Sequence, residues 1–238
     1  MKKTLLVALA LVLACTCAMA QGKKNVKGAP QSITISSNSK VAPNDEGVIK
    51  TFDLPPAEVG LDFPMRVALE KRRSVRDYNE EEVPEELISS LLWTAYGFNR
   101  PDEEKRVVPS AVNVQEFDIY LFTPKGIFRY MAEKNLLELI TEGDHRANIS
   151  EQKHFAIAPV SIVIVANYDR MKVFKDVETR DFYAAVDAGY VSQNIYLFCS
   201  GNGLGTVACG GINRDFLNDV LKITNGKAML AHPVGMMR

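Results

Sequence analysis

The sequence has few of the residues that hold small secreted folds and metal centres together. Of its four cysteines, two lie within the first 20 residues, which leaves only Cys199 and Cys209 in the rest of the chain. Their spacing matches no zinc-binding pattern, and two cysteines form no disulfide scaffold. One intramolecular bridge and two buried thiols are both compatible with the sequence, and the second is favoured. The three histidines are widely separated, which argues against a metal site.

A basic excess and long apolar runs are also missing after the first 20 residues. The formal net charge of −1 arises from interspersed acidic and basic residues, and this balance argues against nucleic-acid binding, which needs a basic surface. No later run is apolar for long enough to cross a bilayer. Neither G-x-G-x-x-G after a first strand nor G-x-x-x-x-G-K-[ST] occurs, so Rossmann and P-loop nucleotide sites are excluded.

The first 20 residues have the three parts of a secretory signal. Two lysines follow Met1, an apolar run covers 5–14, and Ala18-Met19-Ala20 supplies small residues at a cleavage position. We therefore predict a signal peptide over 1–20 and export, most simply to a periplasm. An uncleaved anchor and lipid attachment at Cys15 are the less favoured alternatives. Residues 21–50 are rich in Gly, Ser, Asn and Lys, which predicts a flexible segment before a folded domain over 51–238.

Helical and extended patterns of uneven length follow one another along 51–238. Apolar residues at helical spacing predict helices over 63–72, 84–97, 180–200 and 214–221. Other patterns predict strands over 117–122, 127–130, 136–140, 159–167, 206–209 and 228–234. The run 159–167 is continuous and β-branched, so it should lie centrally with both faces buried. The uneven mixture indicates an α+β fold rather than a doubly wound sheet.

Three guanidinium groups and a hydroxyl are concentrated in residues 72–76. Arg72, Arg73, Ser74 and Arg76 stand at the end of a predicted helix, and arginine side chains bind phosphate bidentately. A solvated helix end would explain the run equally well, because basic side chains offset the helix dipole. Two other segments stand out: the polar loop PSAVNVQ at 109–115, just before a strand, and a stretch with five glycines at 201–211.

Taken together, these segments closely resemble the nitroreductase family of flavin enzymes, and in particular its branch near the peptide azoline (thiazoline/oxazoline) dehydrogenases. The resemblance spans 54–238 and rests on KRRSVR at 71–76, AYGFNR at 95–100, PSAVNVQ at 109–115, GDHR at 143–146, APV at 158–160, DAG at 187–189, SQN at 192–194, GLGT at 203–206 and PVG at 233–235. It implies a nitroreductase-like α+β fold with a central mixed sheet flanked by helices. It also implies an intertwined homodimer that binds two FMN molecules at its interface.

The resemblance implies a role for each matched basic residue. Arg72 and Ser74 match positions that hold the FMN phosphate and ribityl chain, and Arg73 lies beside them. Arg76 matches the cation at the flavin pyrimidine edge, where a positive charge raises the flavin potential. Arg238 is the candidate for the basic residue that relatives often place near the phosphate.

Two loops would complete the flavin site that the resemblance implies. The loop that a partner subunit offers to the isoalloxazine ring is matched by Pro109, Ser110, Ala111 and Asn113. Gly210 and Gly211 match the turn whose backbone N–H addresses flavin N5, and glycine permits that close approach. No catalytic side chain is required beyond the flavin, because hydride passes through N5.

Asp187 is the sharpest polar anomaly, because it lies inside an apolar helix and a buried carboxylate must be paired or hydrogen-bonded. We expect it to bond backbone or arginine groups at the interface rather than to donate a proton to substrate. The histidines are expected in packing or surface positions rather than in catalysis.

The favoured function is an exported FMN-dependent oxidoreductase that transfers hydride or electrons to or from a small planar or unsaturated molecule, such as a nitroaromatic or a quinone. The electron donor stays open, because NAD(P)H is scarce outside the cytoplasm and an exported member could instead oxidise its substrate. The alternative is a non-catalytic flavin-binding or flavin-carrier protein.

Overall fold

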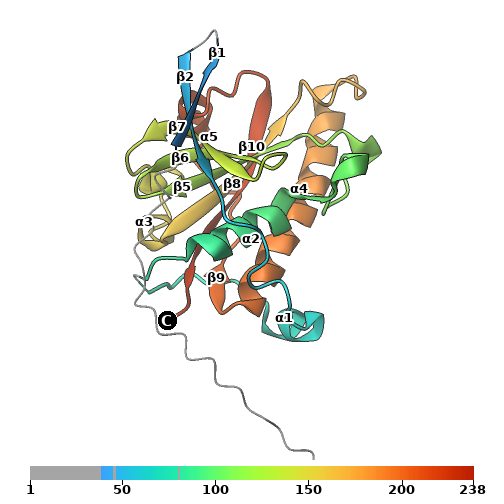
Figure 1. Cartoon of the computed structure of the whole chain (residues 1–238). Coiled ribbons are helices and arrows are strands. Elements are labelled where there is room, and N and C mark those ends of the chain that lie inside the picture. The colour runs from blue at the N-terminus through green and yellow to red at the C-terminus, as the bar shows by residue number, and fades with distance from the viewer. Residues whose placement is uncertain (1–38, 45–46, 80) are drawn as a thin grey trace, which may run out of the picture. The chain divides into compact units, whose positions relative to one another are not determined.

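The computed structural model describes residues 39–44, 47–79 and 81–238, so the predicted signal peptide lies outside the described residues (Figure 1). The helices are α1 (Met65–Lys71), α2 (Glu85–Tyr96), α3 (His154–Ile157), α4 (Val177–Gly201) and α5 (Arg214–Val220). The strands are β1 (Ser39–Asn44), β2 (Gly47–Asp53), β3 (Phe98–Arg100), β4 (Lys105–Arg106), β5 (Phe117–Thr123), β6 (Gly126–Met131), β7 (Leu136–Glu142), β8 (Val160–Asn167), β9 (Leu204–Thr206) and β10 (Gly226–Met236). This mixture confirms the α+β class.

An eight-stranded sheet in the order β1-β2-β7-β6-β5-β8-β10-β9 forms the centre of the described fold. Each neighbouring pair is antiparallel, which corrects the expected mixed sheet. The connections account for this. Tight turns join β5, β6 and β7, and the longer connections through α4 and α5 place β10 antiparallel to both β8 and β9. In the β5–β6 turn, Thr123 Oγ1 accepts the N–H groups of Lys125 and Gly126 at 3.1 and 3.2 Å.

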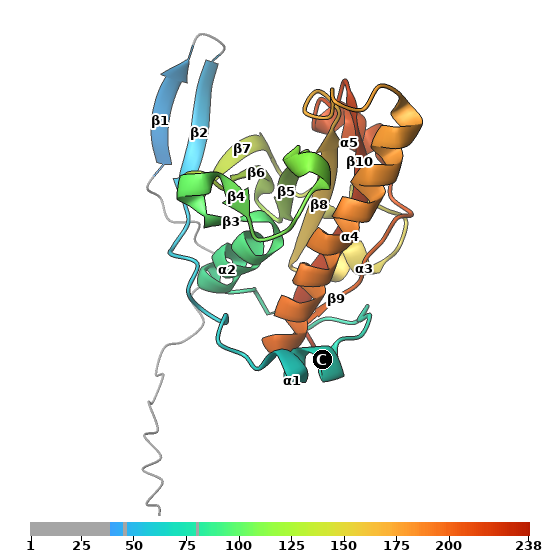
Figure 2. The ribbon, with the colours of Figure 1, turned by 90° about the vertical axis from the view of Figure 1, so that its right-hand side faces the viewer.

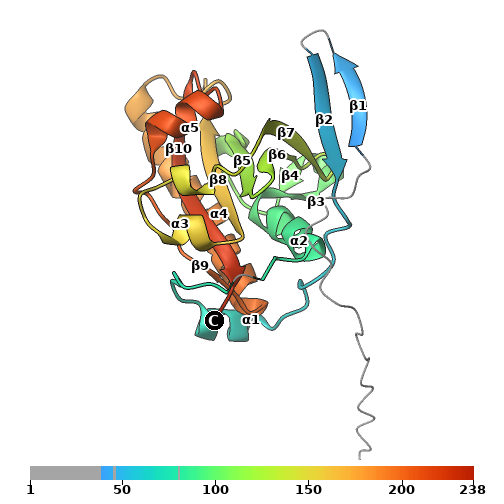
Figure 3. The same ribbon diagram turned by 90° about the vertical axis from the view of Figure 1, so that its left-hand side faces the viewer.

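Helices cover both faces of this sheet (Figures 2 and 3), with α2 and α4 on one face and α3 and α5 on the other. Strand β8 shows how the sequence produces this arrangement. Its Ile162 and Ile164 side chains join the core under α2 and α4, whereas Val163 and Val165 join the core under α3 and α5. Because side chains alternate along a strand, a continuous β-branched run buries both faces. The predicted central strand is therefore confirmed.

The first hairpin extends the sheet at one edge. Strands β1 and β2 pair with each other, and β2 pairs with β7 over Thr51–Asp53. Strand structure therefore begins at Ser39 and reaches into the 21–50 segment that was expected to be flexible. Residues 21–38 lie outside the described part of the chain.

Helix α4 positions most of the candidate site. It has 25 residues, and its first turn is capped by Asp176, whose Oδ1 accepts the N–H of Thr179 at 2.7 Å. Near its C-terminal end, Ser200 Oγ donates to the Ala68 carbonyl of α1 at 2.8 Å. Near its middle, Asn194 Nδ2 donates to the Thr94 carbonyl of α2 at 2.9 Å. The helix is thus fixed against both of its helical neighbours.

Candidate active site

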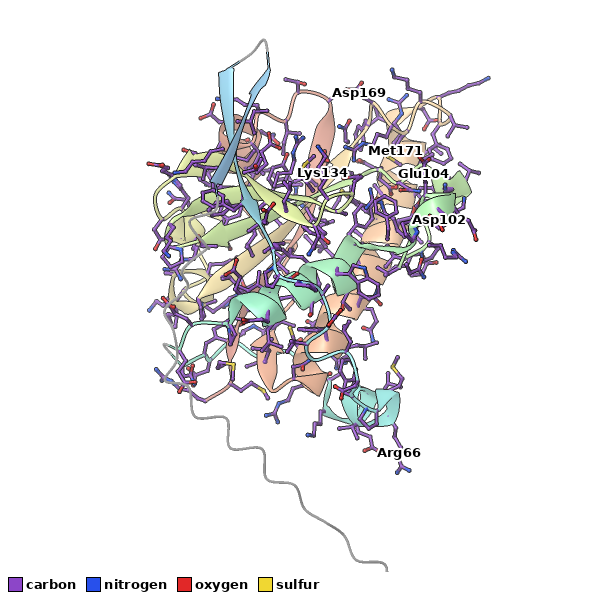
Figure 4. The ribbon with its side chains drawn as sticks, viewed as in Figure 1. Arg66, Asp102, Glu104, Lys134, Asp169 and Met171 are labelled. Carbon is purple, nitrogen blue, oxygen red and sulfur yellow. The ribbon has the colours of Figure 1, made fainter. Side chains whose placement is uncertain are left out.

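Apart from Gly210 and Gly211, the residues expected to bind FMN lie in two groups at different levels of α4. The arginine cluster, formed by Arg72, Arg73, Ser74, Arg76 and Arg238, lies near the C-terminal end of the helix. The 109–115 loop lies nearer its N-terminal end. Figure 4 illustrates this separation, because Arg66 of α1 and Glu104, whose carbonyl bonds to the loop, stand at opposite ends of α4.

The arginine run is an extended segment that follows α1. Arg72 caps the helix by donating its N–H to the Ala68 carbonyl at 2.9 Å, and Val75 N–H then donates to Thr206 of β9 at 2.9 Å. Gly205 makes this contact possible, since a Cβ there would come within 2.6 Å of Val75 Cγ1. These two bonds fix the backbone of the run, and its polar side chains lie at the surface.

Tyr196 of α4 organises this cluster, and the sequence pattern did not identify it. Its hydroxyl lies 2.9 Å from Ser74 Oγ and accepts the Ala208 N–H at 2.9 Å. The Arg72 guanidinium lies 5.1 Å from the centre of the Tyr196 ring, within reach of a cation–π interaction. A tyrosine in an apolar helix resembles any core aromatic residue, so no local signal distinguishes it.

A cavity of about 450 Å³ lies at this cluster, and Arg72, Arg73 and Tyr196 are among the residues that line it. The C-terminus comes to the same place. Met237 bridges to Tyr78, two residues beyond Arg76, and Arg238 Nη1 lies 3.5 Å from Asp77 Oδ1. The structure therefore brings Arg238 beside the arginine run, where its charge is shared with an exposed carboxylate.

The glycine turn after β9 presents bare backbone. Gly210 and Gly211 are exposed, neither has a positive φ, and a Cβ at either would meet only ordinary contacts. Within the described chain, the N–H of neither glycine donates a hydrogen bond. Arg214 Nη2 donates to the Gly210 carbonyl at 3.2 Å. Because C=O and N–H point in opposite directions across a trans peptide, this bond turns the Gly211 N–H away from Arg214.

Cys209 and His154 lie beside this turn. Cys209 Sγ is 3.5 Å from His154 Nε2. Burial raises the pKa of the Cys209 thiol and lowers that of His154, and the nearby Arg76 charge lowers both pKa values. The pair is therefore neutral near pH 7 and is not an activated nucleophile. Cys209 and Cys199 are both free and buried, so the favoured expectation of two thiols is confirmed.

The 109–115 loop is strained. Val112, Asn113 and Gln115 have φ angles of 44°, 59° and 49°, a left-handed conformation that is rare for a β-branched residue such as Val112. Side chains hold the loop at both ends. Asp187 Oδ2 accepts the Ala111 N–H at 2.7 Å, and Ser110 Oγ accepts the Gln115 N–H at 3.0 Å. The expected bond of Asp187 to backbone is confirmed, whereas its place at a subunit interface stays a prediction.

One protomer keeps the two groups apart. Asp187 contacts the loop and Tyr196 contacts the arginine cluster, and nine helical positions separate them. At 1.5 Å per residue this places them about 14 Å apart along the helix axis. The fold thus brings Arg72, Ser74 and Arg238 to one end and Ser110, Ala111 and Asn113 to the other.

An apolar stripe lies on an exposed face of α4, toward the N-terminal half of the helix. Phe182, Val186 and Tyr190, four residues apart, are 62%, 41% and 44% exposed. Gly189 lies among them, and a Cβ built there would meet nothing within 4 Å. The stripe is a face on which another helix could approach closely.

The histidines do not converge on one site. His232 is fully buried, with Nε2 2.9 Å from Ser192 Oγ and Nδ1 3.2 Å from Thr206 Oγ1, and burial lowers its pKa to about 3. His145 Nε2 lies 3.1 Å from the Glu142 carbonyl. Among the described residues, no group of three or more His, Cys, Asp or Glu side chains is arranged to bind a metal. No helix in that part of the chain is long and apolar enough to span a bilayer.

Comparisons with known proteins match the chain to one family. The model of the Nitroreductase family matches residues 69–236. A protein of Methanocaldococcus jannaschii, named as a candidate nitroreductase, is 33% identical over 177 residues, which cover 69% of this chain and 87% of the relative.

Two solved structures show the same fold. A candidate nitroreductase of Ralstonia eutropha superposes with a TM-score of 0.74 and 29% identity, over 84% of this chain and 94% of the other. One from Anabaena variabilis gives a TM-score of 0.61 and 22% identity, over 73% of this chain and 38% of the other, and it supports the fold alone.

Proposed function

Because the chain belongs to the nitroreductase family, we propose that it is an FMN-dependent oxidoreductase whose flavin sites are completed by a homodimer. The observation that supports this most directly is the separation of the arginine cluster from the 109–115 loop along α4. Neither group alone offers both a phosphate site and a surface for a planar ring. A partner subunit that supplies the missing group would complete the site.

The arginine cluster fits the phosphate end of FMN. Arg72, Ser74 and Arg76 stand on a backbone that is fixed to β9, and Arg238 adds a further cation nearby. Fixed guanidinium groups bind phosphate oxygens without a large loss of side-chain freedom. The Gly210–Gly211 turn, whose N–H groups donate no hydrogen bond among the described residues, begins two residues after Ala208, which bonds to Tyr196 of this cluster. These residues therefore fit the flavin that the family implies.

The apolar stripe fits a second copy of the chain. If two α4 helices pack antiparallel about a two-fold axis near residue 191, midway between Asp187 and Tyr196, the loop end of one helix lies beside the arginine end of the other. Gly189 allows close approach at the centre of that contact. Burial of Phe182, Val186 and Tyr190 would supply hydrophobic stabilisation.

The protein residues position the reactants and set the local field. When bound, FMN accepts and returns hydride through its N5 atom. Arg214 orients the Gly211 N–H, and Arg76 places a positive charge close to the same turn. The neutral Cys209–His154 pair needs no role in proton transfer. We propose small planar or unsaturated substrates, such as nitroaromatics or quinones, because a surface over a flavin ring accepts flat molecules.

Export and the electron donor complete the proposal. The 1–20 segment has the pattern of a signal peptide, so we propose that the mature protein acts in the periplasm. Its donor there would be a substrate that it oxidises, as the resemblance to azoline dehydrogenases suggests, or a carrier other than NAD(P)H.

The test is purification of the mature protein followed by denaturation and identification of the released flavin. We expect yellow protein, FMN rather than FAD, and a sedimenting species near twice the mature mass at low micromolar concentration. Anaerobic addition of candidate donors should bleach the flavin, and a nitroaromatic or a quinone should restore its colour. Colourless protein that takes up no FMN would refute the proposal. A yellow monomer that no donor reduces would favour a flavin carrier.

A further inference from the structure

A buried pair of carboxyl groups supports the 109–115 loop. Glu116 follows the loop directly and is fully buried, and Asp187 of α4 is 3% exposed. Asp187 Oδ2 accepts the Ala111 N–H at 2.7 Å. Neither carboxyl oxygen of Glu116 meets a donor among the described residues, although its side chain lies against Asp187. The usual requirement that a buried acid be hydrogen-bonded is therefore met only if the two acids bond to each other.

Such a bond needs one retained proton. Two ionised carboxylates repel and have no hydrogen to donate, whereas a protonated acid donates an O–H to its neighbour. Burial, and then the adjacent Asp187, raise the pKa of Glu116 to about 7, and burial also raises the pKa of Asp187. The pair therefore keeps a proton at pH values where isolated carboxyl groups have lost theirs.

The surroundings of Glu116 favour its charged form only in part: burial together with Asp187 raises its pKa and outweighs its own backbone N–H and Arg170, which lower it. The charged groups that face it are Asp187 and Arg170, and Tyr96 of α2 is the other titratable neighbour. Arg170 donates to the Phe117 carbonyl at 3.0 Å and to Asp118 Oδ1 at 2.7 Å, so its guanidinium is already shared with another carboxylate.

The loop depends on support from outside itself. Val112 has a φ of 44° and is 73% exposed, so its own side chain contributes little packing that would hold this conformation. The Asp187 bond to Ala111 fixes the residue just before it. Loss of this bond leaves the strained turn free to relax.

We propose that Glu116 and Asp187 share one proton and act as a positioning pair, which keeps the Ala111–Asn113 turn in the conformation that it presents to the flavin of the partner subunit. Glu116 donates and Asp187 accepts, which leaves Asp187 Oδ2 for the Ala111 N–H. When the proton is lost as pH rises through about 7, two negative charges are in contact and the turn loosens. The part of this inference that concerns flavin rests on the proposed function, whereas the part that concerns the turn does not.

The first experiment measures the turn itself. Hydrogen-exchange protection of the Ala111 amide, corrected for intrinsic exchange, is compared at about pH 6 and about pH 8 in the protein as purified. We expect the protection factor of the wild type to fall about tenfold from the lower to the higher pH, because linkage to one proton allows a change of that size. Glu116→Gln, whose amide donates to Asp187 at every pH, should lose none. Glu142→Gln, which removes an exposed carboxylate at the end of β7, is the control and should behave as the wild type.

The second experiment measures flavin affinity over the same range. The FMN dissociation constant of the wild type should rise about tenfold relative to that of Glu116→Gln, and ionisation of the FMN phosphate cancels in that ratio. Asp187→Ala should bind weakly at both pH values, because the Ala111 bond is gone. Equal pH profiles for wild type and Glu116→Gln in both experiments would overturn the shared proton. If no variant binds FMN but Ala111 protection follows the expected pattern, the flavin proposal fails and the positioning pair stands.

Discussion

The two ends of α4 support opposite kinds of surface. At the C-terminal end, the arginine cluster exposes cations on a segment without backbone strain. Tyr196 contacts Ser74 through its hydroxyl and Arg72 through its ring face. Near the N-terminal end, the 109–115 loop has no charged side chain and holds strained peptide groups, which Asp187 fixes. One end suits an anion and the other suits a flat neutral ring.

In the proposed function, a second copy of the chain has to bring these two surfaces together. A ligand such as FMN needs both kinds of surface within its own length, and a single protomer separates them by about 14 Å along the helix. Under the proposed function, each folded chain would therefore carry two unlike half-sites. Association through the apolar stripe would convert them into two identical whole sites.

The largest expected effect comes from breaking the association. Val186→Glu places a carboxylate at the centre of the stripe, which the proposed dimer buries against the partner helix. Because an unpaired buried charge costs about 3 kcal/mol or more, we expect a monomer at low micromolar concentration and at least about a hundredfold loss of FMN affinity.

Sedimentation and FMN titration measure both effects of this substitution. Val173→Glu is the matched control, since Val173 is 61% exposed and lies before α4. A Val186→Glu dimer with unchanged affinity would mean that the stripe is not the interface.

A smaller effect is expected from the cationic end alone. Arg72→Ala removes one charge-assisted bond to the phosphate and should weaken FMN binding by about 1.5–3 kcal/mol. Arg66→Ala is the control, because Arg66 of α1 does not line the cavity and pairs with Glu70 at 2.7 Å. Its side chain points outward from the ribbon (Figure 4). Isothermal titration would show equal dissociation constants for the two variants if the phosphate binds elsewhere.

The sequence predicted the cationic end better than the loop end. Three arginines within five residues form a local signal, and their chemistry points to an anion without knowledge of the fold. Asp187 was recognisable as an anomaly, but its partner, the Ala111 N–H, lies 76 residues away in the chain. Contacts at such separations depend on how α4 crosses the loop, which no local pattern specifies.

Glu116 and Tyr196 escaped prediction for a related reason. Glu116 stands at the start of an apolar strand, where a carboxylate is usually solvated, and only the fold buries it completely. Tyr196 occupies a helical position that packing alone would justify. The strand order was likewise beyond local signals, because β10 pairs with β8 and β9, from which it is separated in the chain by α4 and α5 or by α5. Local chemistry was thus predictable, and long-range pairing was not.

Between the two ends of α4, His232 ties the helix to the sheet. It bonds to Ser192 of α4 and Thr206 of β9, and its ring lies 5.5 Å from that of Tyr196. Its environment is dry, so the neutral form is strongly favoured. The contact fixes α4 against β9 and β10, provided that His232 stays uncharged.

The smallest expected effect is a dependence of folding stability on pH, which tests whether His232 stays uncharged. Burial lowers the pKa of His232 to about 3, against about 6.5 in the unfolded chain. The unfolded state therefore binds more protons between these values, and stability falls as pH drops below about 6.5. From about pH 7 to about pH 5 the loss should be about 1–2 kcal/mol. The Glu116–Asp187 pair acts with the opposite sign, since its raised pKa values make the folded state gain protons first.

Urea unfolding of wild type and His232→Asn at both pH values isolates the histidine, because the carboxyl pair is common to the two proteins. The variant should lack the decrease on acidification. A lower starting stability of the variant does not affect the difference between the two pH values. An NMR titration of the wild-type ring provides a check that does not depend on folding of the variant. A His232 resonance that titrates near pH 6.5 in the folded protein would show that the ring is hydrated. The position of α4 would then depend on other contacts, such as Asn194 to Thr94 and Ser200 to Ala68.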